Sequence, residues 1–251
     1  LLRRLATPLE PDGCTVNDAA GELRIEEPGL GLWAYGTEAE GKPQRRLLKP
    51  APARLTTQAQ AKAKTYTWPI LEPSAQTDPV ARLGDAADDP AIWVHPVDAS
   101  QSLVLGTNKK QGLLAYDLQG RQRQLLEAGR LNNVDLRQDI EAGGRRWDLA
   151  VATQRDENAL ALFGIDASSG QLSELARLPT DLKEIYGVCV LRTPAAELEV
   201  VVNDKDGRFQ HYRVERSGEQ WQARLLRHWK LASQPEGCVV DEREQRLFIG
   251  E

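Results

Sequence analysis

The chain repeats its own pattern, and this repetition limits the folds open to it. A β-type run, a polar turn and a second β-type run recur at 102–107 with 112–118, at 147–153 with 159–165 and at 198–203 with 208–214, and a last run lies at 246–251. The first runs begin near 102, 147, 198 and 246, at spacings of 45, 51 and 48 residues. A period of about 40–50 residues with several strands per unit is typical of the blades of a β-propeller.

One more β-type run precedes each of these units, at 91–94, 134–137, 186–191 and 237–241. Helical patterning is almost absent, and only the Ala/Gln/Lys-rich segment 58–64 is compatible with a short helix. The sequence therefore predicts an all-β fold built of propeller blades.

A longer repeat encloses the shorter one. Residues 1–27 align without a gap on residues 225–251, and ten of the 27 aligned positions are identical. A duplicated domain explains this, with 1–48 as the end piece of an upstream repeat and 80–251 as the N-terminal blades of the next. The segment between them, 49–79, contains five prolines and is expected to be a linker.

Composition narrows the function classes. The net charge of −5 and the pI near 5.4 argue against a nucleic-acid partner. No apolar run approaches the roughly 20 residues of a membrane span. The three cysteines, Cys14, Cys189 and Cys238, form no CxxC pair, and their odd number gives no disulfide framework. Each lies in an apolar run, so we expect small buried side chains.

Charged residues recur at matching places in the units. Asp89, Asp135, Tyr186 and Glu236 stand at the start of the first strand, and Lys109, Arg155, Lys205 and Glu251 stand where the second strand turns. Equivalent positions in a propeller lie on a ring around the central channel. We therefore expect one mostly acidic and one mostly basic ring at the same mouth of the channel.

Two interpretations of these rings compete. Asp at a strand edge and Lys in a turn are common as solvated turn residues. Alternatively, the carboxylates of Asp88, Asp89, Asp135, Glu236 and Glu251, with backbone carbonyls, gather calcium. Lys109, Arg155 and Lys205 would then bind phosphate oxygens. A common register among the blades favours the second interpretation, because solvation requires no register.

Several segments resemble the β-propeller phytases in order and spacing. They are Asp-Ala-Ala-Asp-Asp-Pro-Ala-Ile-Trp at 85–93, Thr-Asn-Lys-Lys-Gln-Gly-Leu at 107–113, Leu-Asn-Asn-Val-Asp at 131–135, Glu-Ile-Tyr-Gly at 184–187 and Pro-Glu-Gly at 235–237. The resemblance implies a six-bladed propeller in which several calcium ions stabilise the fold and build the active site. A metal-held water then attacks phosphorus directly. The family's propeller continues past the position of Glu251, so the propeller here is expected to be incomplete; closure of the propeller by residues 1–48 is the alternative arrangement.

The resemblance also assigns roles to individual residues. It implies calcium ligands at Asp88, Asp89, Pro90, Val134, Asp135, Glu236 and Glu251. It implies phosphate binders at Lys109, Lys110, Arg155, Tyr186 and Lys205. The residues expected to take part in catalysis are Lys109, Arg155, Tyr186, Glu236 and Glu251.

The first functional hypothesis is a calcium-dependent phosphomonoester hydrolase that releases phosphate from inositol hexakisphosphate. It would be secreted or periplasmic, with a tandem phytase domain as an intramolecular partner. A second hypothesis is an inactive phytase-like module that binds phosphorylated substrate or partners, and a third is a protein-interaction propeller. The pairing of carboxylates with basic residues favours the first two over the third. The number of blades distinguishes the first two, because too few blades cannot assemble every ligand.

Overall fold

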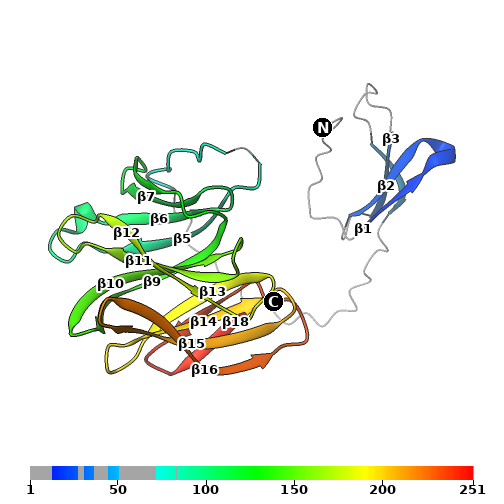
Figure 1. Ribbon diagram of the computed structural model, residues 1–251. Coiled ribbons are helices and arrows are strands. Elements are labelled where there is room, and N and C mark those ends of the chain that lie inside the picture. The colour runs from blue at the N-terminus through cyan, green and yellow to red at the C-terminus, as the bar shows by residue number, and fades with distance from the viewer. Residues whose placement is uncertain (1–12, 28–30, 37–44, 51–71, 83, 251) are drawn as a thin grey trace, which may run out of the picture. The chain divides into compact units, whose positions relative to one another are not determined.

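The computed structural model describes residues 13–27, 31–36, 45–50, 72–82 and 84–250, and the chain divides into two units, Leu1–Ile70 and Leu71–Glu251 (Figure 1). This division falls within the segment 49–79 that the sequence suggested as a linker. The short helix considered at 58–64 lies outside the described residues. The boundaries of the three expected segments stay a prediction.

The first unit is an antiparallel sheet in the order β1 (Gly13–Asn17), β2 (Glu22–Glu27), β3 (Gly31–Gly36) and β4 (Arg45–Pro50), with the 3₁₀ turn η1 (Asp18–Ala20) after β1. Its first two strands pair in the register expected from the repeat. Cys14 lies opposite Ile25, and Cys238 lies opposite Ile249 in the corresponding hairpin of the second unit. The longer sequence repeat is therefore a repeat of structure.

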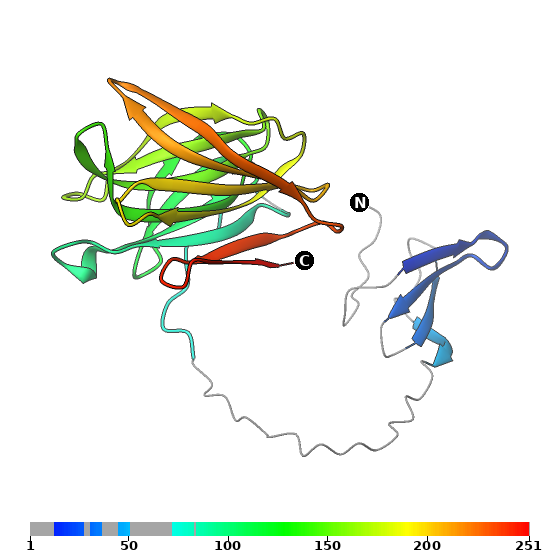
Figure 2. The same ribbon diagram turned by 90° about the horizontal axis from the view of Figure 1, so that it is seen from below.

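The described residues of the second unit form three four-stranded antiparallel sheets and one two-stranded sheet, each with its strands in chain order. Figure 2 shows this unit from below the view of Figure 1. The first comprises β5 (Ala87–Trp93), β6 (Leu103–Asn108), β7 (Gly112–Asp117) and β8 (Gln122–Leu126), with the 3₁₀ turn η2 (Ala99–Gln101) between β5 and β6. The second comprises β9 (Leu131–Ala142), β10 (Arg145–Gln154), β11 (Ala159–Ile165) and β12 (Leu172–Pro179). The third comprises β13 (Ile185–Arg192), β14 (Leu198–Asp204), β15 (Arg208–Ser217) and β16 (Gln220–Lys230). The last pairs β17 (Gly237–Asp241) with β18 (Arg246–Gly250).

The strand positions confirm the all-β prediction. Every β-type run read from the sequence lies wholly or largely within one of the strands β5–β7, β9–β11, β13–β15, β17 and β18. The fourth strands β8, β12 and β16 were missed. Most positions in these strands are exposed or partly buried and many residues are polar, so their hydrophobic signal is weak.

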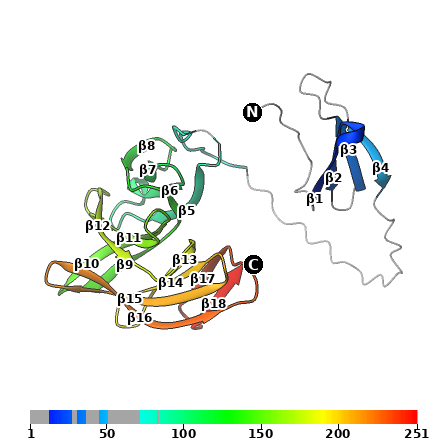
Figure 3. The same cartoon turned by 45° about the vertical axis from the view of Figure 1, so that its right-hand side comes forward.

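The sheets are arranged as propeller blades. The first strands of successive sheets, β5, β9, β13 and β17, contact one another in turn (Figure 3). Clusters of buried apolar side chains span neighbouring blades: Trp93 and Phe163 belong to the first cluster, and Leu160 and Val200 belong to the second. The expected incomplete β-propeller is therefore confirmed, whereas the count of six blades stays a prediction. Within the described residues, no helix is long and apolar enough to cross a membrane.

The cysteines correct one prediction. Cys189 on β13 and Cys238 on β17 form a disulfide across a sequence separation of 49 residues, and Cys14 is exposed with a free thiol. Spacing did not reveal this pair because its members come from the first strands of successive blades. The bond links the last described hairpin covalently to the third blade.

Replacement of Cys238 by Ser should lower the free energy of unfolding by about 2–4 kcal/mol, because a closed loop of this length restricts the unfolded chain. Thermal denaturation under non-reducing conditions measures the loss. Cys14→Ser is the matched control and should leave the melting temperature unchanged. Equal melting temperatures for Cys238→Ser and the parent protein would contradict the expectation.

Candidate functional site

Three basic residues occupy the same position in three successive blades. The backbone N–H of Lys109 donates to the carbonyl of Ala86 over 2.7 Å, that of Arg155 to Arg130 over 2.8 Å, and that of Lys205 to Glu184 over 3.2 Å. Each bond joins the turn after a blade's second strand to the chain that enters its first strand. The side chains of Lys109, Arg155 and Lys205 therefore start from equivalent points at one end of the blades.

A second set of hydrogen bonds joins each blade to the next. Thr107 Oγ1 donates to the carbonyl of Asn132. Thr153 Oγ1 donates to the carbonyl of Tyr186 over 2.6 Å, and Asn203 Nδ2 donates to that of Pro235 over 3.2 Å. These three side chains are buried beside the turns that carry Lys109, Arg155 and Lys205, which are called the basic turns below. They therefore fix the start of the next blade's first, or inner, strand next to a basic turn.

These bonds also correct the register of the acidic ring. The N–H of Asp89 donates to Thr107 Oγ1 over 2.9 Å, and the N–H of Asn133 donates to Thr153 Oγ1 over 3.1 Å. Asn133 is therefore the structural counterpart of Asp89. Asp135 lies two residues further along β9, where it pairs with Val151. Matching by residue type chose Asp135 because the counterpart in this blade is not a carboxylic acid. The expected register is also wrong for Tyr186: its carbonyl accepts from Thr153 as that of Asn132 accepts from Thr107, so Tyr186 corresponds to Asp88.

Tyr186 lies at the centre of the basic groups. Lys205 Nζ is 5.2 Å from the centroid of its ring, and Arg155 Cζ is 5.9 Å from it. The pKa of the Tyr186 hydroxyl is raised, first by burial and then by its hydrogen bond to the Glu236 carboxylate, whereas the charge of Lys109 acts to lower it. The structure thus places Lys109, Arg155, Lys205 and Glu236 around Tyr186, and the roles expected of these residues stay predictions.

Lys109 is held by two carboxylates of the segment that enters β5. Its Nζ lies 2.6 Å from Asp85 and 3.5 Å from Asp88, and the hydrogen bond with Asp85 is the main cause of its raised pKa. Lys110 lies nearby, because a Cβ added at Gly84 would be 3.2 Å from its Nζ. Sequence reasoning passed over Asp85, which stands at the start of the Asp-Ala-Ala-Asp-Asp-Pro segment.

The inner strands surround a cavity of about 320 Å³, which Asp89, Pro90, Val134 and Asp135 line together. Asp89 Oδ2 accepts hydrogen bonds from Asn133 Nδ2 over 3.1 Å and from the Val134 N–H over 3.0 Å. Burial raises the pKa of Asp89, and the charges of Asp88 and Asp135 raise it further. A cation in this cavity would relieve the repulsion among these carboxylates.

Asp135 has a different environment. Its Oδ1 accepts hydrogen bonds from the Leu136 N–H over 2.7 Å and from Arg137 Nη1 over 3.0 Å, and its Oδ2 accepts one from the Val190 N–H over 2.9 Å. Arg137 also donates to Glu242 over 2.6 Å, so the network links the second blade to the last described hairpin. These contacts give Asp135 a role in joining blades.

The expected metal ligands are present only in part. Across the described ranges, no three His, Cys, Asp or Glu side chains are grouped so as to hold a metal ion. The Asp89 carboxylate and the nearby backbone carbonyls are oxygen donors of the type that suits calcium. Glu251 lies outside the described residues. Among the described residues these oxygens are only part of the ligand set that calcium requires, and the ligand roles expected from the sequence stay predictions.

The first unit shows another use of the position that corresponds to Glu251. Its counterpart in the repeat, Glu27, is buried and accepts hydrogen bonds from the Tyr35 hydroxyl and from Arg45 Nη1, each over 3.0 Å. Because Arg45 already neutralises this carboxylate, Glu27 serves as a structural ion pair.

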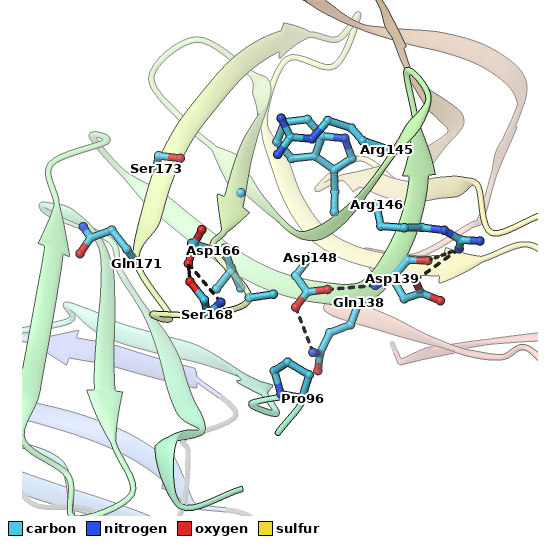
Figure 4. Close-up of a pocket in the computed structure, with 14 residues that line it drawn as sticks. Pro96, Gln138, Asp139, Arg145, Arg146, Asp148, Asp166, Ser168, Gln171 and Ser173 are labelled. Atoms are coloured by element: carbon cyan, nitrogen blue, oxygen red, sulfur yellow. Dashed lines mark hydrogen bonds and ion pairs between the residues drawn. The ribbon is translucent and has the colours of Figure 1, made fainter. Parts of the chain in front are cut away.

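A larger cavity of about 680 Å³ lies at the β9–β10 and β11–β12 turns, at the opposite end of the blades from the basic turns (Figure 4). At its base, Asp148 accepts hydrogen bonds from Trp93 Nε1 over 2.7 Å, from Gln138 Nε2 over 3.1 Å and from the Asp139 N–H over 2.9 Å. Arg146 pairs with Asp139 at 3.3 Å. These polar groups form hydrogen bonds and an ion pair with one another. The basic cluster at the other end of the blades, formed by Lys109, Arg155 and Lys205, is therefore the better candidate site.

Comparisons with known proteins identify the family of the chain. The model of the Phytase family matches residues 44–251. A 3-phytase from Bacillus subtilis (strain 168) is 39% identical over 184 residues, which cover 70% of this chain and 48% of that protein. The chain belongs to the Phytase family. It spans about half the length of this curated relative.

Solved structures with similar architecture include the β-propeller domain of Cps50 (Swd1) from Myceliophteria thermophila, with a TM-score of 0.41 and 10% identity over 95% of this chain and 62% of that one. The periplasmic gluconolactonase PpgL of Pseudomonas aeruginosa has a TM-score of 0.39 and 19% identity over 64% of this chain and 42% of that one. Both TM-scores are low, and neither likeness supports a conclusion about function.

Thr153→Val should lower the free energy of unfolding by about 1–2 kcal/mol, because the Tyr186 carbonyl and the Asn133 N–H lose their shared partner. It should also weaken phosphate binding, since Tyr186 would no longer be fixed between Arg155 and Lys205. Chemical denaturation and calorimetric titration with inorganic phosphate measure the two effects.

Thr193→Val is the matched control, because Thr193 Oγ1 accepts a hydrogen bond from the Glu197 N–H over 3.1 Å in the β13–β14 turn, at the opposite end of the blades. The control should lose stability without losing phosphate affinity. Equal phosphate affinity in both variants would contradict the role given to Thr153.

Proposed function

We propose that the protein is a phosphomonoester hydrolase that removes phosphate from inositol hexakisphosphate with the help of calcium. The observation that carries the proposal is the convergence of Lys109, Arg155 and Lys205 from three blades around Tyr186. A polyphosphorylated ring requires several cations at fixed positions, and blades in register supply them. Membership of the Phytase family supports the same substrate class.

The basic side chains have complementary roles in this proposal. Arg155 presents a planar guanidinium that can bind two oxygens of one phosphate, while Lys109 and Lys205 act as compact charges on either side. Lys110 extends the basic surface. Tyr186 holds Arg155 and Lys205 in place through its ring and orients Glu236 through its hydroxyl. Together these groups bind the substrate and neutralise charge as the phosphorus–oxygen bond breaks.

Calcium would supply the activated water and additional positive charge. Asp89 and the carbonyls of Pro90 and Val134 would hold one ion in the channel, near Asp88. Glu236 and Glu251 are the residues proposed as ligands of active-site calcium. For Asp135, the three hydrogen bonds that its carboxylate already accepts favour a structural role over direct ligation.

A phytase-like module that binds phosphorylated molecules without hydrolysis is the second candidate. The observation that favours it is the partial set of metal ligands among the described residues. Both candidates use the same basic cluster, so hydrolysis distinguishes them. Secretion or export to the periplasm fits either candidate, because the Cys189–Cys238 disulfide is stable in oxidising compartments. A tandem phytase domain remains the proposed intramolecular partner.

The enzyme assay is direct. Incubation of the protein with inositol hexakisphosphate and millimolar calcium should release inorganic phosphate, and chelation should abolish the release. Arg155→Ala should reduce kcat/KM by about 10²-fold or more, since it removes a charge-assisted contact to the reacting group. Arg224→Ala is the control, because Arg224 pairs with Glu215 at 2.8 Å on the outermost strand β16.

Binding without phosphate release over a wide pH range would favour the non-hydrolytic module. Equal activities for Arg155→Ala and Arg224→Ala would reject the assignment of the site.

Calcium binding has its own test in thermal denaturation. Calcium should raise the melting temperature of the parent protein, because a ligand that binds only the folded state stabilises it. Asp89→Asn should remove most of this increase. Asp135→Asn should lower the melting temperature without calcium and keep the increase. The opposite pattern would make Asp135 the ligand.

A further inference from the structure

Asp85 covers the first member of the basic cluster. Its carboxylate lies 2.6 Å from Lys109 Nζ, closer than Asp88 at 3.5 Å. The two partners differ in their access to water: the Asp85 side chain is 81% exposed, whereas that of Lys109 is 19% exposed. An exposed anion thus lies over a half-buried cation at the place where the proposed substrate would enter.

Lys109 is one of three cations that act on this carboxylate. The pKa of Asp85 is lowered mainly by its hydrogen bond with Lys109, and the charges of Lys110 and Arg155 lower it further. These are three of the residues to which the proposed function gives phosphate contacts. The Asp85 carboxylate therefore lies in the positive electrostatic field in which a substrate phosphate group would bind.

We propose that Asp85 is an exchangeable stand-in for a substrate phosphate, bound to Lys109 in the free protein and displaced when a phosphate group arrives. The proposal rests on the proposed function and adds a control on the affinity of that site. In this arrangement Asp85 competes with phosphate for Lys109 and so lowers the affinity of the site. A polyphosphorylated ligand overcomes this competition, because its other phosphates bind elsewhere in the cluster. Inorganic phosphate lacks these additional contacts. The Asp85 carboxylate therefore displaces it from Lys109 and promotes product release.

Displacement of Asp85 is physically easy. Exposed ion pairs contribute little net stability, because water screens the charges and the side chains lose freedom. A phosphate group offers up to two negative charges and several acceptor oxygens in place of one carboxylate. Asp88 remains 3.5 Å from Lys109 Nζ and keeps the ammonium in position after Asp85 leaves.

Calorimetric titration of the full chain with inorganic phosphate tests the proposal. Asp85→Asn should bind phosphate about two- to fivefold more tightly than the parent protein, the range expected for removal of one exposed competing charge. Asp85→Ser should behave alike, and Asp85→Glu should restore the parent affinity. Asp206→Asn is the control: Asp206 lies beside Lys205 but pairs with Arg208 at 2.8 Å, so its loss should change phosphate affinity less.

Unchanged or weaker phosphate binding by Asp85→Asn would overturn the proposal. Weaker binding together with a reduced affinity for calcium would identify Asp85 as a metal ligand instead. The outcome is separable from that of the proposed function. If Asp85→Asn binds phosphate more tightly but the parent protein does not hydrolyse inositol hexakisphosphate, the proposal for Asp85 is supported and the hydrolytic function is rejected. Hydrolysis with no tightening rejects the stand-in alone.

Discussion

The candidate site depends on the hydrogen bonds through which each blade fixes the start of the next. Thr107, Thr153 and Asn203 donate from the ends of three second strands to carbonyls at the beginning of the following inner strands. Because these donors are buried, a lost bond leaves a carbonyl without a partner, which is costly. The basic turns therefore keep a common register, and Lys109, Arg155 and Lys205 reach the same region.

Carboxylates of one chemical type take different roles because their surroundings differ. Asp89 is partly desolvated and lies beside other acids, so a cation would stabilise it. Asp135 accepts hydrogen bonds from Arg137 and from backbone N–H groups, and Glu27 accepts them from Arg45 and Tyr35. Asp85 is exposed and pairs with Lys109 at the surface. Burial and existing partners, more than residue type, separate the expected metal ligand from the structural carboxylates.

Much of this arrangement could be predicted from sequence, because a propeller converts sequence spacing into spatial equivalence. The spacing of the β-type runs located the first three strands of each full blade. The equivalent positions of Lys109, Arg155 and Lys205 followed from this spacing. The outer strands were missed because their partly exposed faces carry a weak hydrophobic signal. The counterpart of Asp89 was missed because hydrogen-bond register, and not charge, defines it. The disulfide was missed because the contact between Cys189 and Cys238 exists only once the blades are packed.

A crystal structure with calcium and inositol hexasulfate, a sulfate analogue that a phosphatase does not hydrolyse, tests the central claim most directly. The account predicts one ligand at the basic end of the blades, with sulfate oxygens in contact with Lys109, Arg155 and Lys205 together. A ligand bound at the opposite end, or in contact with only one of these residues, would contradict it.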